Sequence, residues 1–144
     1  MQRVRRANVE VDGEVVGAVE HGLCVFLGVA RSDSPSGAAR MAAKIARLRI
    51  FADDAGKMNR SLQDIGGSVL LISQFTLLGD ATGGNRPSFV DAAVPEIAEP
   101  LFAHVAESLR AEHRLPVALG RFRHHMLVRI ENDGPVTITL RVDA

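Results

Sequence analysis

The sequence predicts an α/β fold, and three observations predict it. Apolar and polar residues alternate with a period of two near the start of the chain and again in its last quarter, which is typical of half-buried strands. Two segments between them repeat their apolar residues at helical spacing. A short continuous apolar run, residues 69–72, indicates a strand covered on both faces. With 144 residues, we expect residues 1–144 to form one domain.

The first thirty residues are expected to form three antiparallel strands. Residues 4–11 alternate loosely and meet Asp12-Gly13, a strong signal for a hairpin turn. Residues 14–19 would return from that turn, and a third strand would run from Gly22 to Val29. Three such strands in succession indicate a curled sheet.

A first helix is predicted from Ser34, which would cap it, with Pro35 at the first helical position. Its apolar stripe is Ala38, Met41, Ala42, Ile45 and Leu48. The opposite face is basic and carries Arg40, Lys44 and Arg47. The simplest interpretation is a solvated face, and contact with an RNA backbone is the alternative.

The middle of the chain is expected to hold a polar loop, residues 52–61, and then a buried strand, residues 68–73. Ligands tend to bind beyond the carboxyl ends of such strands. Residues 73–76 occupy that position here. The glycine-rich stretch 78–88 follows it and is interpreted as a lid or an edge of the substrate site.

A second helix is expected from Pro95, with the apolar stripe Ala98, Leu101, Phe102, Val105 and Leu109. Pro100 lacks an N–H, so either the regular helix starts near Glu99 or its first turns are bent. Residues 122–130 and 136–142 then alternate like the two strands of a closing hairpin. Its bend would be Asn132 to Pro135, either an ordinary turn or a rigid turn presenting two carbonyl oxygens.

Composition excludes several function classes. The formal net charge is zero, so any RNA contact should be local. The single cysteine, Cys24, permits no internal disulfide and is interpreted as a buried, inert thiol. Neither a signal peptide nor an apolar run of membrane-spanning length is present, so we expect a cytoplasmic protein. Metal-binding and P-loop motifs are absent, and we expect no metal and no cofactor.

The five histidines offer no chelating cluster. We expect His104 and His113 to be exposed, and His124 to be a core or interface residue on the apolar strand face. His125 would share the other strand face with Arg121, Arg123 and Arg129, a basic stripe that is either solvated or in contact with phosphates.

Ser73 and Thr76 are hydroxyls at a strand end, where a nucleophile would be well placed. A threonine nucleophile needs an adjacent base, and the local sequence supplies none. We therefore expect Ser73, Gln74, Phe75 and Thr76 to act mainly through backbone N–H groups that bind a carbonyl oxygen as it gains charge. Phe75 would form a flat wall for a terminal base or an aminoacyl group.

Five motifs together resemble the D-aminoacyl-tRNA deacylases over essentially the whole chain. They are Gln2-Arg3-Val4, Gly56-Lys57-Met58-Asn59, Ser73-Gln74-Phe75-Thr76-Leu77, Arg86-Pro87-Ser88-Phe89 and Asn132-Asp133-Gly134-Pro135-Val136-Thr137, in the family's order. The residues the motifs assign to catalysis are Ser73, Gln74, Phe75 and Thr76. Those assigned to substrate binding are Arg3, Met58, Asn59, Arg86, Gly134 and Pro135. His124 departs from the family, where a small residue is common.

The resemblance implies a three-layer α/β/β fold with a curled, barrel-like β portion and two main helices. It implies hydrolysis of the ester that joins a D-amino acid, or glycine, to the 3′ end of tRNA. It also implies a homodimer in which a cis Gly134–Pro135 bond enters the partner's pocket and excludes L-amino acids, Arg3 holding that motif. The 2′-hydroxyl of the terminal ribose would take part in catalysis. No membrane and no other protein partner is implied.

Two other functions remain open at this point. One is a related editing deacylase acting on a mischarged L-aminoacyl-tRNA, a class that includes a relative with a trans Gly-Pro bond and the editing domain of archaeal threonyl-tRNA synthetase. The other is a non-catalytic module that binds an RNA end.

Overall fold

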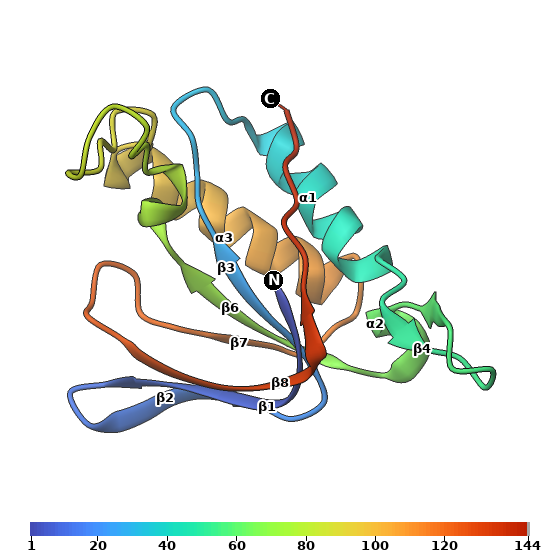
Figure 1. The fold of residues 1–144 in the computed structure, drawn as a ribbon. Helices are drawn as coiled ribbons and strands as arrows, with labels where there is room; N and C mark the ends of the chain where they lie inside the picture. The colour runs from blue at the N-terminus through green and yellow to red at the C-terminus, as the bar shows by residue number, and fades with distance from the viewer. Residues whose placement is uncertain (144) are drawn as a thin grey trace.

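A curled sheet forms the centre of the molecule, and two long helices cover one of its faces (Figure 1). The computed structural model describes residues 1–143. The main sheet has the strand order β2-β1-β3-β6-β7, with β8 paired to the other edge of β1. Its strands are β1 (Gln2–Val11), β2 (Glu14–Val19), β3 (Gly22–Leu27), β6 (Ser68–Ser73), β7 (Val117–Leu119) and β8 (Leu127–Thr137). The helices are α1 (Pro35–Arg47), α2 (Leu62–Ile65), α3 (Pro95–Ala111) and a short 3-10 helix, η1 (Phe75–Leu78).

The sheet bends because β1 shares one edge between two partners. Its first residues pair with β3, its last residues pair with β2, and β8 runs along its opposite edge. The bend carries β2 towards β7: a Cβ built on Gly17 would lie 2.6 Å from the Leu119 carbonyl oxygen. The sheet is therefore nearly closed and barrel-like, as predicted.

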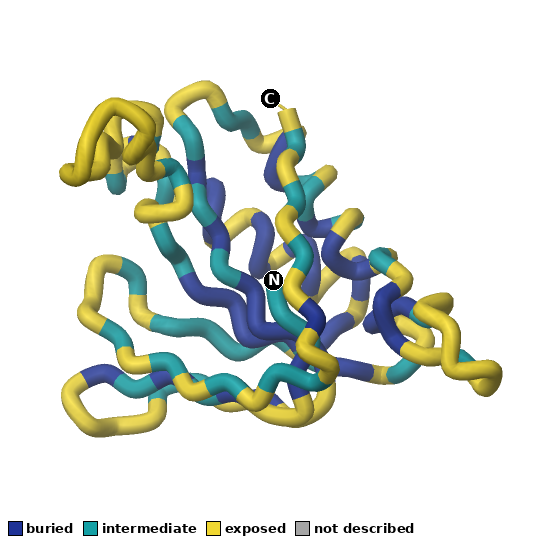
Figure 2. Tube along the Cα trace, in the orientation of Figure 1, coloured by how far each residue is buried: buried dark blue, intermediate teal, exposed yellow. Residues whose placement is uncertain are grey.

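Strands β3 and β6 separate two cores, which explains their continuous apolar sequences. The two strands run parallel and in register, Gly22 facing Ser68 and Leu27 facing Ser73. Leu23, Val69 and Leu71 pack against the helices, whereas Cys24, Leu70 and Ile72 fill the inside of the curled sheet. Figure 2 shows these strands as the buried centre of the molecule. The predicted three layers, with two main helices, are thus confirmed.

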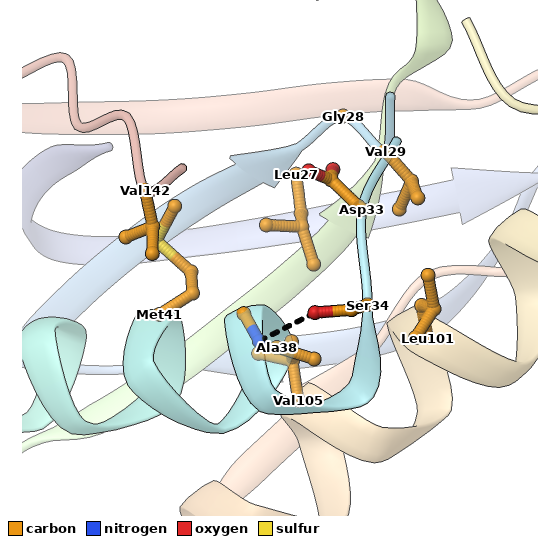
Figure 3. Close-up of a pocket in the computed structure, with 11 residues that line it drawn as sticks. Leu27, Gly28, Val29, Asp33, Ser34, Ala38, Met41, Leu101, Val105 and Val142 are labelled. Atoms are coloured by element: carbon orange, nitrogen blue, oxygen red, sulfur yellow. Dashed lines mark hydrogen bonds between the residues drawn. The ribbon is translucent and has the colours of Figure 1, made fainter. Parts of the chain in front are cut away.

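Both long helices begin where the sequence places them. The Ser34 hydroxyl accepts a hydrogen bond from the Gly37 N–H at 3.2 Å, drawn as a dashed line in Figure 3, and Pro35 opens α1. Helix α3 begins at Pro95, so Pro100 lies inside it. Pro100 cannot supply the hydrogen bond that a helical N–H gives to the carbonyl four residues earlier. The alternative in which the regular helix starts near Glu99 is therefore wrong, and the bend of its first turns stays a prediction.

Two predicted connections are wrong. The polar loop 52–61 contains a small hairpin of β4 (Phe51–Ala52) and β5 (Met58–Arg60), too short to leave a pattern of alternation. The segment Asn132 to Pro135 is not the bend of a hairpin. Strand β8 continues through it and stays paired with β1, so the segment is a bulge in one strand.

The pairing of residues 136–142 was therefore also predicted wrongly. Only the start of this stretch lies in β8. Ile138 and Met1 then exchange two backbone hydrogen bonds of 2.9 Å, and the chain leaves the sheet. It runs towards the start of α1, where Val142 lies beside Met41 at the edge of a cavity of about 40 Å³ (Figure 3).

Two histidines differ from expectation. His113 is buried because the chain turns back at the end of α3, with Arg114 at φ 55°, and its carbonyl accepts a bond from the Gln63 amide. His124 is exposed, so its core alternative is wrong, because residues 121–126 contain a turn and no strand, with Arg123 at φ 65°. Its interface alternative stays a prediction. His104 is exposed, as predicted.

No helix in the described part of the chain is long and apolar enough to cross a membrane.

Cys24 provides a test of this packing. Burial raises the pKa of its thiol to about 12, so the nucleophilic thiolate is strongly disfavoured at pH 8. We expect a disulfide reagent such as 5,5′-dithiobis(2-nitrobenzoate) to leave the folded protein unmodified and to titrate one thiol per chain in denaturant. Rapid modification of the folded protein would contradict the position of Cys24 between β1 and β6.

Candidate active site

A cleft of about 700 Å³ opens where β6 ends. Its floor is the segment from Ser73 to Thr76, and its walls come from the start of α3 and the turn before β8. All four residues predicted to be catalytic line this cleft: Ser73, Gln74, Phe75 and Thr76. The structure thus places them together beyond the carboxyl end of a buried strand, as the sequence predicted.

The neighbouring strand holds the floor of the cleft in place. The Gln74 N–H donates to the Leu27 carbonyl at 2.9 Å, which extends the β3–β6 pairing by one step before η1 begins. Gly28 follows directly and packs beneath η1. A Cβ there would lie 2.5 Å from Leu78 Cδ2 and 3.1 Å from the Gln74 carbonyl oxygen. Gly28 is therefore a supporting residue that sequence reasoning missed.

Phe75 stands at the mouth of the cleft and is 56% exposed. Its ring packs edge-on against Phe89, with ring centroids 5.1 Å apart. The contact fixes one side of the ring and leaves the rest of it open to a ligand. This geometry suits the predicted role of a flat wall for stacking.

The Thr76 hydroxyl contacts an amide and not a base. Gln74 Nε2 donates a 3.0 Å hydrogen bond to Thr76 Oγ1. An amide donor does not remove a proton from a hydroxyl, so this contact does not activate Thr76 as a nucleophile. The arrangement fits a segment that presents its backbone.

The cleft also contains residues that sequence reasoning missed or placed elsewhere. Arg31, Phe89, His124 and His125 all line it. One ring nitrogen of His124, Nδ1, lies 3.0 Å from the Phe122 carbonyl oxygen, which orients the imidazole. The alternating pattern did not indicate that the two histidines line the cleft, because it predicts a strand through residues that contain a turn.

A second group of predicted site residues surrounds the bulge in β8. Arg3 donates from Nε to the Asp133 carbonyl at 2.8 Å and from Nη1 to the Ile50 carbonyl at 2.7 Å. Asn132 spans the bulge, because its Oδ1 accepts from the Val136 N–H at 2.7 Å. The Gly134–Pro135 peptide bond is cis, and both residues are exposed.

Gly134 has a backbone conformation that only glycine adopts readily. Its φ is 150°, and a Cβ would lie 2.8 Å from the Val136 backbone nitrogen. Any side chain at this position would disturb the bulge.

The two groups lie at opposite ends of the sheet. Asn132 pairs with Val4, which pairs with Gly22, and Gly22 faces Ser68 at the start of β6. Ser73 is five residues further along, roughly 17 Å at strand spacing. Figure 1 shows η1 at one end and the bend of β8, beside α2, at the other.

The remaining predicted residues do not join the cleft. Met58 and Asn59 are exposed on the β4–β5 hairpin. Arg86 is exposed in the glycine-rich loop 79–88, which is closed by a bridge between Asp80 and Ser88. One chain therefore assembles the four residues of the cleft floor and leaves the others outside it.

Comparison with known proteins agrees with the motifs. The model of one family, described as D-Tyr-tRNA(Tyr) deacylase, matches residues 1–141. The chain belongs to this family. Two D-aminoacyl-tRNA deacylases of the family, from Anaeromyxobacter dehalogenans and Deinococcus radiodurans, are 57% identical over 140 residues and 56% identical over 142 residues. The alignments cover 97% and 99% of this chain, and 93% and 97% of those proteins.

Solved structures show the same architecture. The c-Myc DNA Unwinding Element Binding Protein is 41% identical, with a TM-score of 0.93, and the match covers 99% of this chain and 97% of that one. A probable eukaryotic D-amino acid tRNA deacylase is 15% identical, with a TM-score of 0.79 over 93% of this chain and 92% of that one, and supports the fold alone.

The position of η1 can be tested through Gly28. We expect Gly28→Ala to destabilise the protein by about 1–3 kcal/mol, because the new methyl group collides with Leu78 Cδ2 and lies tightly against the Gln74 carbonyl oxygen. Gly83→Ala is the matched control, since a Cβ at Gly83 meets nothing within 4 Å. Its effect should stay within about 0.5 kcal/mol. Denaturant unfolding measures both, and equal stabilities would contradict the close packing of Gly28 under η1.

Proposed function

We propose that the cleft hydrolyses the ester of a D-aminoacyl-tRNA, and of glycyl-tRNA, with the backbone N–H groups of Phe75 and Thr76 at the end of the segment Ser73 to Thr76 as its catalytic donors. In this proposal Gly134 and Pro135 of a second subunit close the cleft and reject L-amino acids. The observation that carries the proposal is that, within one chain, the motif residues form two separate groups. An open cleft lies at one end of the sheet, and an exposed, rigidly held bulge lies at the other.

Membership of the family makes the chain a D-aminoacyl-tRNA deacylase, which is a hydrolase. The reaction adds water to the ester carbonyl carbon and breaks the bond from that carbon to the ribose oxygen. The products are the free D-amino acid and the deacylated tRNA.

The carbonyl oxygen gains negative charge in the transition state, and the protein has to stabilise that charge. N–H groups at the start of η1 are suited to it, because a 3-10 helix leaves its first N–H groups without partners in the helix. Preorganised donors of this kind contribute several kcal/mol of transition-state stabilisation. The 2′-hydroxyl of the substrate's terminal ribose is proposed to assist the attacking water, so the protein needs no base beside Thr76.

The second subunit is proposed because the bulge cannot reach the cleft of its own chain. The apolar surface available for dimerisation lies around the mouth of the cleft. It comprises the exposed side chains Phe75, Leu77, Val90, Val94 and Ile97. The face with Met126, Val128 and Ile130 is also apolar, but it is half-buried against the chain's own barrel core and is not available.

Chirality would be read by the main chain. We propose that the Gly134 and Pro135 carbonyl oxygens accept hydrogen bonds from the substrate's α-ammonium group. That contact leaves the side chain of a D-amino acid pointing outwards, whereas an L side chain would collide with the bulge. Specificity obtained by exclusion of the wrong enantiomer needs a rigid wall, and the Arg3 and Asn132 contacts would supply it.

The first test separates backbone from side-chain catalysis. We expect Thr76→Ala to keep most of the deacylation rate, because the hydroxyl is not the nucleophile. We expect Phe75→Pro to lose about 10²–10³-fold in kcat, since it deletes one backbone N–H. Proline is tolerated at the first position of a helix, and Gln74 has the extended backbone that precedes proline readily.

The control is Phe75→Ala, which removes the ring and keeps the N–H. Its kcat should lie closer to that of the native enzyme than the kcat of Phe75→Pro. Single-turnover hydrolysis of D- and L-tyrosyl-tRNA is the measurement for all three variants. An acyl-enzyme trapped on Thr76, or an inactive Thr76→Ala, would refute backbone catalysis. A protein that binds but never hydrolyses the ester would be an RNA-end binding module instead.

The second test is complementation between two inactive variants. Gly134→Ala should abolish D-tyrosyl-tRNA hydrolysis or its preference over the L-substrate, because its Cβ displaces the bulge. Phe75→Pro damages the cleft and leaves the bulge of its own chain intact. Co-expression with two affinity tags yields a heterodimer, in which the intact cleft of one subunit faces the intact bulge of the other. We expect this heterodimer to regain about half the activity of the native dimer, since one of its two sites is intact.

Gly13→Ala is the control for backbone strain, because Gly13 also has positive φ (81°) but lies in the remote β1–β2 turn. It should leave activity unchanged. A heterodimer as inactive as its parents, or a fully active monomer in light scattering, would show that each chain completes its own site.

A further inference from the structure

A groove of about 620 Å³ lies outside the cleft and is lined by four cations, Arg40, Lys44, Arg47 and Arg49. We call it the α1 groove. Its remaining lining residues are Ala43, Leu48 and Met58. Three of the cations follow one face of α1 at positions i, i+4 and i+7, a row that extends about 10 Å along the helix. Arg49 continues the row beyond the end of the helix.

The charge of the α1 groove is not neutralised by its surroundings. All four cations are exposed, and none forms an ion pair among residues 1–143. Helix α1 contains no acidic residue. The negative end of its dipole, about half a charge, is small beside four full charges. In a chain with zero net charge, this is a local excess of positive charge.

The carboxylate of Asp64, which lies close enough to Arg49 to be influenced by its charge, is already engaged. Asp64 Oδ2 accepts a hydrogen bond from the Ser61 backbone N–H at the start of α2, and the Asp64 backbone N–H donates to Ser61 Oγ. Hydrogen bonding to the backbone and side chain of Ser61 lowers the pKa of the Asp64 carboxyl, with a smaller contribution from Arg60 and Arg49. It is therefore fixed as a helix cap and does not close the groove. Arg40 donates hydrogen bonds to the Ser36 hydroxyl and to the backbone carbonyl of Asp143.

The groove adjoins the bulge in β8. Arg3 binds the Ile50 carbonyl with one nitrogen and the Asp133 carbonyl with another, and Ile50 follows Arg49 directly. Figure 1 shows the end of α1 beside α2 and the β4 hairpin, next to the bend of β8. A polyanion bound in the α1 groove would therefore extend towards Gly134 and Pro135.

We propose that the α1 groove binds backbone phosphates of the substrate tRNA close to its 3′ end. This inference rests on the proposed function: Gly134 and Pro135 enter the partner's cleft, so the groove of one subunit flanks the aminoacyl site of the other. Three arginines suit phosphate, because a guanidinium group donates two parallel hydrogen bonds to its oxygens. The wall has no acidic side chain, and its apolar residues Leu48 and Met58 offer a surface on which an unpaired base can rest. Contacts of this kind bind a nucleic-acid strand without reading its sequence.

The experiment compares two double variants that remove the same charge. Lys44→Gln with Arg47→Gln removes the two positive charges at the centre of the groove. Arg6→Gln with Arg129→Gln is the matched control, because both arginines are exposed and already paired, with Glu131 and Glu10. Binding of deacylated tRNA is measured by fluorescence anisotropy over a range of salt concentrations.

We expect the groove variant to bind tRNA at least about tenfold more weakly at ~0.1 M salt, with the slope of log K against log[salt] less steep by about 2. The control should stay within about twofold of the native protein, a loss too small for a phosphate contact. For D-tyrosyl-tRNA, KM should rise in the groove variant with kcat unchanged. Hydrolysis of D-tyrosyl-adenosine, which has no phosphates to bind, should be unaffected.

Native affinity and salt slope in the groove variant would overturn the proposal, and so would an equal loss in the control. Loss of D-tyrosyl-adenosine hydrolysis in the groove variant would also overturn it, since the residues would then act on the aminoacyl site itself. Failure of the native protein to hydrolyse either ester would refute the proposed function instead. These outcomes are therefore distinguishable.

Discussion

The paired segments of β1 and β8 differ in length, and this difference is the constraint on which the rest of the structure depends. From Gln2 to Val4 the first strand advances by two residues, while the last strand covers the five-residue step from Thr137 back to Asn132. The surplus has to leave the sheet, and it leaves as the bulge with Gly134 and Pro135. Arg3 lies between Gln2 and Val4 in β1 and binds the Asp133 carbonyl, so the strand segment that forces the bulge also holds the bulge in place. The sheet keeps its pairing on both sides of the bulge, which makes it a rigid projection instead of a mobile loop.

The parallel pair β3–β6 determines what the other end of the molecule presents. Because both faces of this pair are buried, its residues are committed to packing, and chemistry is available only where β6 ends. The Leu27 carbonyl and the absent side chain of Gly28 then position η1. The distance between bulge and cleft follows from strand length alone, so the same pairing that stabilises the chain keeps its two motifs apart. The proposed second subunit would bring the two motifs together without any rearrangement of the fold.

Sequence patterns predicted the elements with local signals and missed those that depend on distant contacts. Asp12-Gly13, the Ser34 cap and the apolar run of β6 are local, and the structure has all three. Apolar residues alternate with a period of two on both sides of a hairpin bend, and they do so equally on both sides of a bulge. The alternation therefore could not reveal that β8 continues through Asn132. His124 lines the cleft only because Arg123 adopts a left-handed turn, which no pattern of apolar residues records. The cleft residues were predictable from a strand end and a motif, whereas the bulge was assigned to the site by resemblance alone.

The proposed backbone recognition would also explain which features of a ligand this protein can distinguish. A deacylase for D-amino acids has to accept many side chains and reject one configuration at the α-carbon, so contacts to the side chain would be counterproductive. In the proposed function, carbonyl oxygens of the bulge and N–H groups of η1 bind the α-ammonium and the ester, which every aminoacyl group has. The cations of the α1 groove are proposed to bind phosphates, which every tRNA has. Each proposed contact is to a group common to all substrates, and discrimination would be left to one wall whose shape depends on the absence of a side chain at Gly134.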